Sequence, residues 1–167
     1  MKWLSIRSTC AAVLSFAVTL CAGSALAQSA KDLVGTWTLV SAKTDMGGNI
    51  TDTFGANAKG MLSLDAAGRY VLMVLGPNLP KFASNNRLSG TADEYKAVVS
   101  GSIAHFGTYV VNEGDKTLVF RIESATFPNW DKTEQKRAMS LTGDDLSYKV
   151  ATASGGGSAT VTWKRAK

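Results

Sequence analysis

Apolar and polar residues alternate with a period of two along most of the chain from residue 33 onward. This pattern is typical of β-strands with one buried face, and clusters of Gly, Asn and Asp separate the segments as turns. Short strands at even spacing predict either an up-and-down barrel or a sandwich. We predict eight strands, over residues 35–44, 59–65, 69–75, 104–112, 116–123, 133–141, 146–151 and 159–165, with residues 50–54 as a further short strand or an irregular return.

Two segments depart from this alternation. Residues 70–75 (YVLMVL) are apolar at every position, which predicts a strand covered on both faces. Residues 91–94 (TADE) form a capping box, the signature of a helix N-terminus, and an apolar stripe at helical spacing follows them. We therefore predict one short helix that lies against the outer face of strand 70–75.

The N-terminus has the composition of a secretory signal peptide. A basic start precedes an apolar run over residues 10–22, and the small residues Ala25 and Ala27 stand where a signal peptidase cleaves. The apolar run is too short to cross a bilayer. We expect residues 1–27 to be removed, leaving a secreted or periplasmic protein that has no stable membrane insertion and forms a single domain over residues 28–167.

Composition excludes several kinds of chemistry from the mature chain. Both cysteines, Cys10 and Cys21, lie in the signal peptide, so no disulfide, thiolate nucleophile or cysteine metal site is expected. His105 is the only histidine, whereas zinc takes three or four ligands, and we expect no metal and no cofactor. Loss of the leader reduces the formal net charge from +5 to +3. The basic residues are scattered, so we expect no nucleic-acid partner.

Two terminal motifs resemble the barrel-closing signature of lipocalins and their calycin relatives. These are Gly35-x-Trp37 at the start of the first strand and the basic run after Trp163 at the end of the last. Residues 33–41 (LVGTWTLVS) and 127–137 (FPNWDKTEQKR) are more specifically similar to the bacterial and fungal lipocalin-like domain family. The resemblance spans nearly the whole mature chain and implies an all-β, eight-stranded antiparallel up-and-down barrel with an internal pocket. It implies that Trp37 lies under a basic side chain of the final strand, with Arg165 the candidate, and it implies no particular activity.

Alternation places Arg137 and Gln135 on the interior face of their strand. A buried arginine needs an acceptor or a partner charge. Two interpretations follow: Arg137 binds the anionic head group of a ligand, or it forms an internal ion pair with Glu123 or Asp131.

Further side chains could line a pocket. His105 is either a general base or haem ligand in the cavity, or a structural histidine. Trp130, together with Phe82 and Phe127, is either an aromatic lid or part of a second core outside the barrel. Phe106 and Tyr148 belong to the pool of aromatic side chains expected to line the barrel. The candidate ligand-binding residues are Tyr70, Met73, His105, Tyr109, Phe120, Trp130, Gln135 and Arg137, and the candidate closure residues are Gly35, Trp37 and Arg165.

Three functions fit the pattern. The preferred hypothesis is a barrel that binds a small apolar or amphipathic molecule and is not an enzyme. The second is a small isomerase- or cyclase-type enzyme that uses His105, Tyr109 and Arg137, with Glu123. The third is a filled barrel that acts as a protein-interaction or stress module through strand 70–75. No nucleophile elbow, phosphate loop or paired-carboxylate spacing is present, so we assign no catalytic residue.

Overall fold

The computed structural model describes residues 29–167. The predicted signal peptide, with its cleavage site after Ala27, lies outside the described residues. Within the described part, no helix combines the length and the apolar character that a membrane crossing requires.

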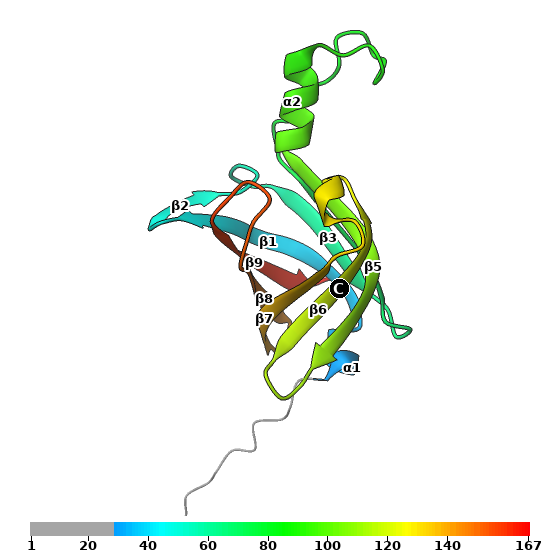
Figure 1. The fold of residues 1–167 in the computed structure, drawn as a ribbon, viewed down its shortest axis with the longest axis vertical. Coiled ribbons are helices and arrows are strands. Elements are labelled where there is room, and N and C mark those ends of the chain that lie inside the picture. Colours follow the sequence, from blue (N-terminus) through cyan, green and yellow to red (C-terminus); the bar gives the residue numbers. More distant parts are fainter. Residues whose placement is uncertain (1–28) are drawn as a thin grey trace, which may run out of the picture.

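The described residues form one antiparallel sheet that closes on itself (Figure 1). The order of the strands is β2-β1-β3-β4-β5-β6-β7-β8-β9, and β9 pairs again with β1, so eight strands make a closed barrel and β2 is an extra strand. The predicted all-β barrel is therefore confirmed. The strands are β1 (Gly35–Met46), β2 (Asn49–Asp52), β3 (Lys59–Leu64), β4 (Arg69–Leu75), β5 (Ser102–Asn112), β6 (Thr117–Ala125), β7 (Glu134–Thr142), β8 (Asp145–Val150) and β9 (Ser158–Arg165).

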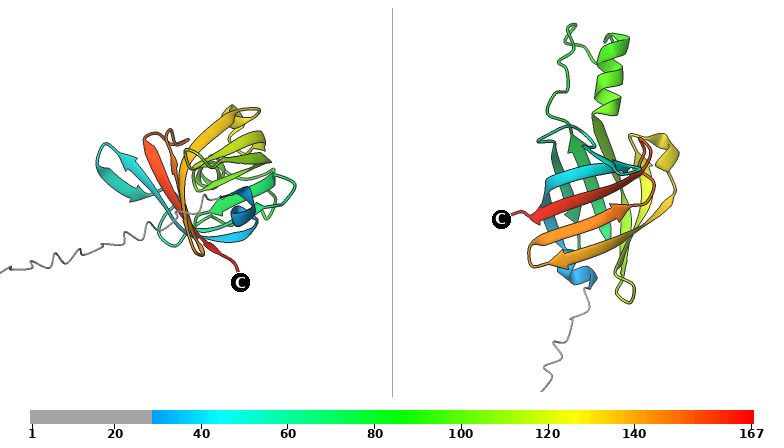
Figure 2. Two further views of the ribbon diagram at one scale, coloured as in Figure 1. Left: turned by 90° about the horizontal axis from the view of Figure 1, so that it is seen from below. Right: turned by 90° about the vertical axis from the view of Figure 1, so that its left-hand side faces the viewer.

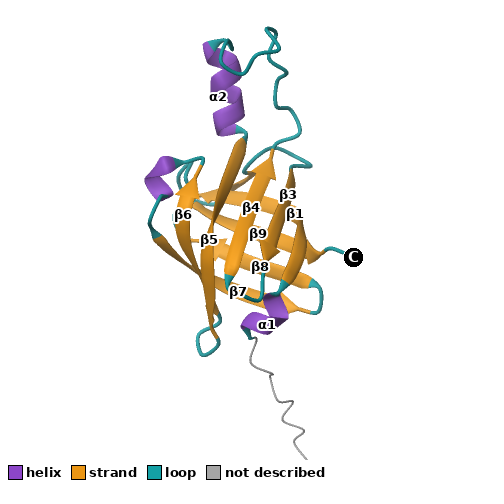
Figure 3. Ribbon diagram, turned by 90° about the vertical axis from the view of Figure 1, so that its right-hand side faces the viewer, coloured by secondary structure: helices purple, strands orange, loops and turns teal. Residues whose placement is uncertain are grey.

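Strand β1 is long enough to pair with three other strands. Its residues 35–38 pair with β3 and its residues 43–46 pair with β2, while its other edge pairs with β9. The β1–β2 hairpin consequently extends away from the ring of strands (Figure 2). The barrel has a short helix, α1 (Ala30–Leu33), at one end, and helix α2 (Ala92–Ser100) beyond the other (Figure 3).

The α1 end of the barrel is closed around Trp37, which is fully buried. Its indole Nε1 donates a hydrogen bond to the carbonyl oxygen of Leu33 at 2.9 Å, which holds α1 across the opening. The guanidinium carbon of Arg165 lies 4.2 Å from the Trp37 ring centroid. The same guanidinium donates to the carbonyl oxygens of Val34 and Asp32, at 2.9 and 2.6 Å, so the last strand is joined to the segment that enters the first.

Strand β4 is covered on one face only, contrary to the prediction. Tyr70, Leu72 and Val74 point inward and are buried, whereas Val71 and Met73 are 58% and 45% exposed on the outer face. The apolar sequence of residues 70–75 therefore does not mean that both faces of β4 are covered.

Helix α2 does not cover the outer face of β4, which corrects the second part of that prediction. The predicted capping box is present, with the Thr91 hydroxyl accepting a hydrogen bond from the amide of Glu94. Only Gly101 separates α2 from β5, so the helix continues beyond the end of that strand and projects away from the barrel (Figures 1 and 3). The helix therefore leaves the outer face of β4 uncovered.

Candidate functional site

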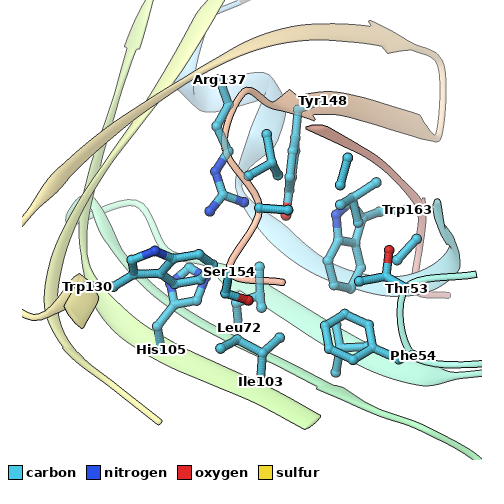
Figure 4. Close-up of a pocket in the computed structure, with 16 residues that line it drawn as sticks. Thr53, Phe54, Leu72, Ile103, His105, Trp130, Arg137, Tyr148, Ser154 and Trp163 are labelled. Carbon is cyan, nitrogen blue, oxygen red and sulfur yellow. The ribbon is translucent and has the colours of Figure 1, made fainter. Parts of the chain in front are cut away.

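The interior of the barrel is filled at the α1 end and hollow at the α2 end. Large side chains with no exposed surface, among them Trp37, Leu62 and Leu118, fill the closed end. A cavity of about 50 Å³ lies in the other half, where β4 ends and β5 begins (Figure 4). Its walls are mostly apolar and include Leu72 and Ile103.

Three loops supply the residues at the rim of this cavity. Phe54 follows β2, Ser154 belongs to the β8–β9 loop, and Trp130 ends the short 3₁₀ helix η1 (Pro128–Trp130). The Trp130 ring meets the His105 ring edge to face, with 5.7 Å between the ring centroids. Trp130 is thus fixed against the barrel wall as well as lining the cavity.

The other two aromatic residues of the predicted lid have different surroundings. Phe127 packs edge to face on Trp130, with 5.6 Å between the ring centroids. Phe82 instead packs on Tyr95 of α2, with its ring centroid 5.6 Å away. Only Trp130 of the three lines the cavity.

Arg137, on β7, is 3% exposed and lines the cavity. Its guanidinium carbon lies 4.9 Å from the ring centroid of Phe120 and 4.9 Å from that of Tyr148. Its Nη2 donates a hydrogen bond of 2.7 Å to Oε1 of Gln135. The two rings and the amide fix the position of the guanidinium, but none of them carries a negative charge.

The carboxylates considered as partners of Arg137 are engaged elsewhere. Glu123 forms an ion pair with Arg69 at the barrel surface, with 3.0 Å between Oε2 and Nη2. Asp131 accepts a hydrogen bond from the backbone amide of Ala125 at 2.6 Å. Within residues 29–167, Arg137 therefore has no carboxylate partner, and the ion-pair interpretation is wrong.

Three buried polar groups around the cavity have no hydrogen-bond partner in the described part of the chain. They are Nε of Arg137, the hydroxyl of Tyr148 and Nε1 of Trp163. All three residues line the cavity (Figure 4). Burial raises the pKa of Tyr148, although the charge of Arg137 and the N–H groups of Trp163 and Arg137 beside the hydroxyl act in the opposite direction. The hydroxyl therefore keeps its proton at neutral pH, and the three groups lie next to one another without a well-formed hydrogen bond between them. Because buried polar groups are normally paired, this cluster marks a place prepared for a ligand or for bound water.

His105 faces the same cavity but carries no charge there. Its Nδ1 lies 2.8 Å from the hydroxyl of Tyr70, and its side chain is 3% exposed. Burial, and secondarily the nearby charge of Arg137, lower the pKa of His105 from 6.5 to about 3. Burial also raises the pKa of Tyr70. The phenol is protonated and the imidazole is neutral, so the tautomer of the His105 ring sets which of the two groups donates.

The remaining candidates lie away from the cavity. The hydroxyl of Tyr109 donates to the backbone carbonyl of Asp65, in the β3–β4 turn at the closed end. Met73 and Phe106 lie on the outer face of the sheet, so the expectation that they line the interior is wrong. Tyr70 and Met73 are an odd number of positions apart, and strict alternation cannot place both inside.

Sequence reasoning missed most of the residues that form the cavity, among them Trp163, Phe54 and Ser154. Trp163 belongs to the closure motif, and it also alternates with Val161 and Ala159 on the buried face of β9. That alternation could have identified it. Phe54 and Ser154 belong to loops, and no local pattern indicates that they reach the cavity.

The residues of the enzyme hypothesis do not come together. His105 and Arg137 line the cavity, whereas Tyr109 is bonded at the closed end and Glu123 is paired outside the barrel. Nor does the described part of the chain bring three His, Cys, Asp or Glu side chains close enough together to hold a metal ion.

A closed antiparallel barrel with a cavity at one end and a tryptophan plug at the other has the architecture of the lipocalin-like proteins. The family model for the lipocalin-like domain matches residues 34–166, and the chain belongs to this family.

Individual relatives were also found. The 4'-hydroxy-3'-methoxypropiophenone carrier protein of Aspergillus oryzae is 28% identical over 83 residues, which are 46% of this chain and 75% of that protein. Among solved structures, wild-type fluorescent protein UnaG aligns over 82% of this chain and 99% of its own, with 14% identity and a TM-score of 0.37. A UnaG mutant aligns over 81% and 97%, with 13% identity and the same TM-score.

Proposed function

We propose that this protein is a secreted or periplasmic binding protein for a small amphipathic molecule, which it holds in the cavity at the α2 end of the barrel. The observation that carries the proposal is the cluster of three unpartnered polar groups in a largely apolar cavity. An apolar wall with a few convergent polar groups is the usual composition of a small-molecule site.

The volume of the cavity indicates how such a molecule would sit. A bound water needs about 10–15 Å³ of cavity volume, so about 50 Å³ accommodates the polar end of a ligand or a few waters. The apolar body of the ligand would extend toward the rim, between Phe54, Trp130 and Ser154. Rim and cavity together favour a compact ligand with one polar end.

The relative from Aspergillus oryzae supports the same class of ligand. Its name describes a carrier of a small aromatic ketone that bears hydroxyl and methoxyl groups. We extend from it only the general property, which is binding of a small molecule with an apolar ring and few polar atoms.

A panel of small aromatic and aliphatic compounds tests the proposal by thermal shift and calorimetry. The variant Ala159→Leu adds bulk to a residue that lines the cavity, and we expect it to abolish binding. Thr160→Leu introduces the same side chain on the opposite face of β9 and should bind like the wild type. Binding of no compound by the wild type, or equal binding by Ala159→Leu, would contradict the proposal.

A further inference from the structure

We propose that the ligand is a small monocarboxylic acid, whose carboxylate is held by Arg137, Tyr148 and Trp163. This inference rests on the proposed function and specifies the chemistry of the polar end. Its basis is the identity of the three unpartnered groups: Nε of the guanidinium, the phenol hydroxyl and Nε1 of the indole.

These groups are complementary to an acceptor. Guanidinium and indole nitrogens can only donate hydrogen bonds, and the Tyr148 hydroxyl is protonated and free to donate. A carboxylate is acceptor-only and has about four lone-pair sites, so it satisfies several donors without adding one of its own. An amide or an alcohol would bring its own N–H or O–H beside two groups that only donate, so fewer of its atoms would serve as acceptors for the guanidinium and the indole.

The charge of Arg137 also favours a carboxylate ligand. Arg137 is buried without a carboxylate partner within the described residues, and an uncompensated buried charge is costly. A ligand that carries one negative charge removes this cost. Among the described residues that line the cavity, Arg137 is the only Lys, Arg, Asp or Glu, and His105 is neutral. A doubly charged phosphate would therefore leave excess negative charge.

The guanidinium is held in place before any ligand arrives. Gln135 fixes one end through its hydrogen bond to Nη2, and the rings of Phe120 and Tyr148 lie against the guanidinium carbon. A fixed donor loses little conformational entropy on binding, which favours affinity. Nε is left without a partner, and this is the atom that we assign to the carboxylate.

The test compares two probes of nearly equal shape, 3-phenylpropanoate and 3-phenylpropanamide, by calorimetry at pH 7.4. For the wild type, we expect the acid to bind at least about tenfold more tightly than the amide, because hydrogen bonds between a guanidinium and a carboxylate are stronger than those to a neutral acceptor. Arg137→Met should lose that preference for the acid, and Arg137→Lys should retain part of it. Lys136→Met removes a neighbouring charge on the exposed face of β7 and should bind as the wild type does.

The outcomes separate this inference from the proposed function. If the amide binds the wild type as tightly as the acid does, or if Arg137→Met keeps the acid preference, the carboxylate assignment is wrong while the binding function stands. If only neutral compounds of the wider panel bind, the assignment is likewise wrong. If no compound binds the wild type at all, both proposals fail. Near-ultraviolet circular dichroism checks that each variant keeps its native packing.

Discussion

The guanidinium of Arg165 lies over the indole of Trp37 and joins the last strand of the barrel to the first, with 4.2 Å between the guanidinium carbon and the ring centroid. Gly35 makes this approach possible. Its φ of +138° lies in a region that L side chains rarely adopt, and a Cβ atom there would lie 3.0 Å from Nη1 of Arg165. One glycine, one tryptophan and one arginine therefore close the α1 end together.

Replacement of Arg165 by methionine should open this closure. The change removes the cation–π contact, worth about 0.5–2 kcal/mol, and two hydrogen bonds to backbone carbonyls. We expect the free energy of unfolding in urea to fall by about 2 kcal/mol. Lys164→Met removes the neighbouring cation, which pairs with Asp145 at the surface, and should cost less than 1 kcal/mol, roughly. Equal losses of stability in the two variants would show that the contacts of Arg165 stabilise the protein no more than a surface ion pair does.

Replacement of Gly107 by alanine should be strongly destabilising. Gly107 lies at the irregularity in the pairing of β5 with β6, and an added Cβ would collide with the backbone carbonyl oxygen of Arg121. Backbone cannot move as easily as a side chain, so we expect a loss of about 3 kcal/mol or more in the free energy of unfolding. Gly155→Ala is the control, because its added Cβ meets nothing within 4 Å. A mild effect at Gly107 would mean that the irregularity is easily remodelled.

The architecture could be predicted from the sequence because it depends on local patterns. The period of two identified the strands, and the turn residues separated them. The pair of terminal motifs indicated which strands meet, and β1 does pair with β9. Each of these signals is contained in a few neighbouring residues.

Apart from Met73 and Trp163, which local alternation places correctly, the failures concern contacts between distant segments. Whether Arg137 has a partner depends on where Glu123 points, and the register of the sheet places Glu123 beside Arg69 at the surface. The direction of α2 depends on its single-residue connection to β5. Phe54 and Ser154 reach the cavity only because the barrel brings their loops to the same end. No pattern within a single segment contains this information.

The stability of the protein should depend on His105 in mildly acidic solution. The pKa of His105 falls from 6.5 to about 3 on folding, so between these values the unfolded chain binds a proton that the folded chain does not. Stability from this residue is complete above pH 6.5 and is lost as the pH falls, at up to about 1.4 kcal/mol per pH unit. Chemical denaturation between pH 7.5 and 5 measures this slope.

His105→Asn is the matched variant for this titration. Asparagine offers an acceptor to the Tyr70 hydroxyl but cannot titrate, and the chain has no other histidine. The variant should be less stable than the wild type at pH 7.5 and should show a flatter dependence on pH down to 5. Parallel curves for the two proteins would show that His105 stays accessible to protons in the folded state.

Replacement of Arg137 by methionine should stabilise the ligand-free protein. The wild type keeps a buried positive charge with no carboxylate partner in the described chain, and an apolar side chain of similar length removes that cost while still packing against Phe120 and Tyr148. Replacement of whole buried ion pairs by apolar residues is neutral or stabilises proteins by about 1–4 kcal/mol. Arg137 lacks even the compensating partner of such a pair, and we expect a gain of about 1 kcal/mol in urea unfolding.

The same variant should lose the preference for acids, so stability and acid selectivity would change in opposite directions. Opposite changes in stability and binding are expected where a binding site contains a group that destabilises the free protein but binds the ligand. If Arg137 were purely structural, its replacement would instead lower the stability of the protein. Gln135→Leu provides the comparison, because it removes the amide that holds Nη2 but leaves the charge in place. It should lower stability, since a further guanidinium hydrogen atom then has no acceptor. A loss of stability in Arg137→Met as large as that in Gln135→Leu would identify Arg137 as part of the core and not of a binding site.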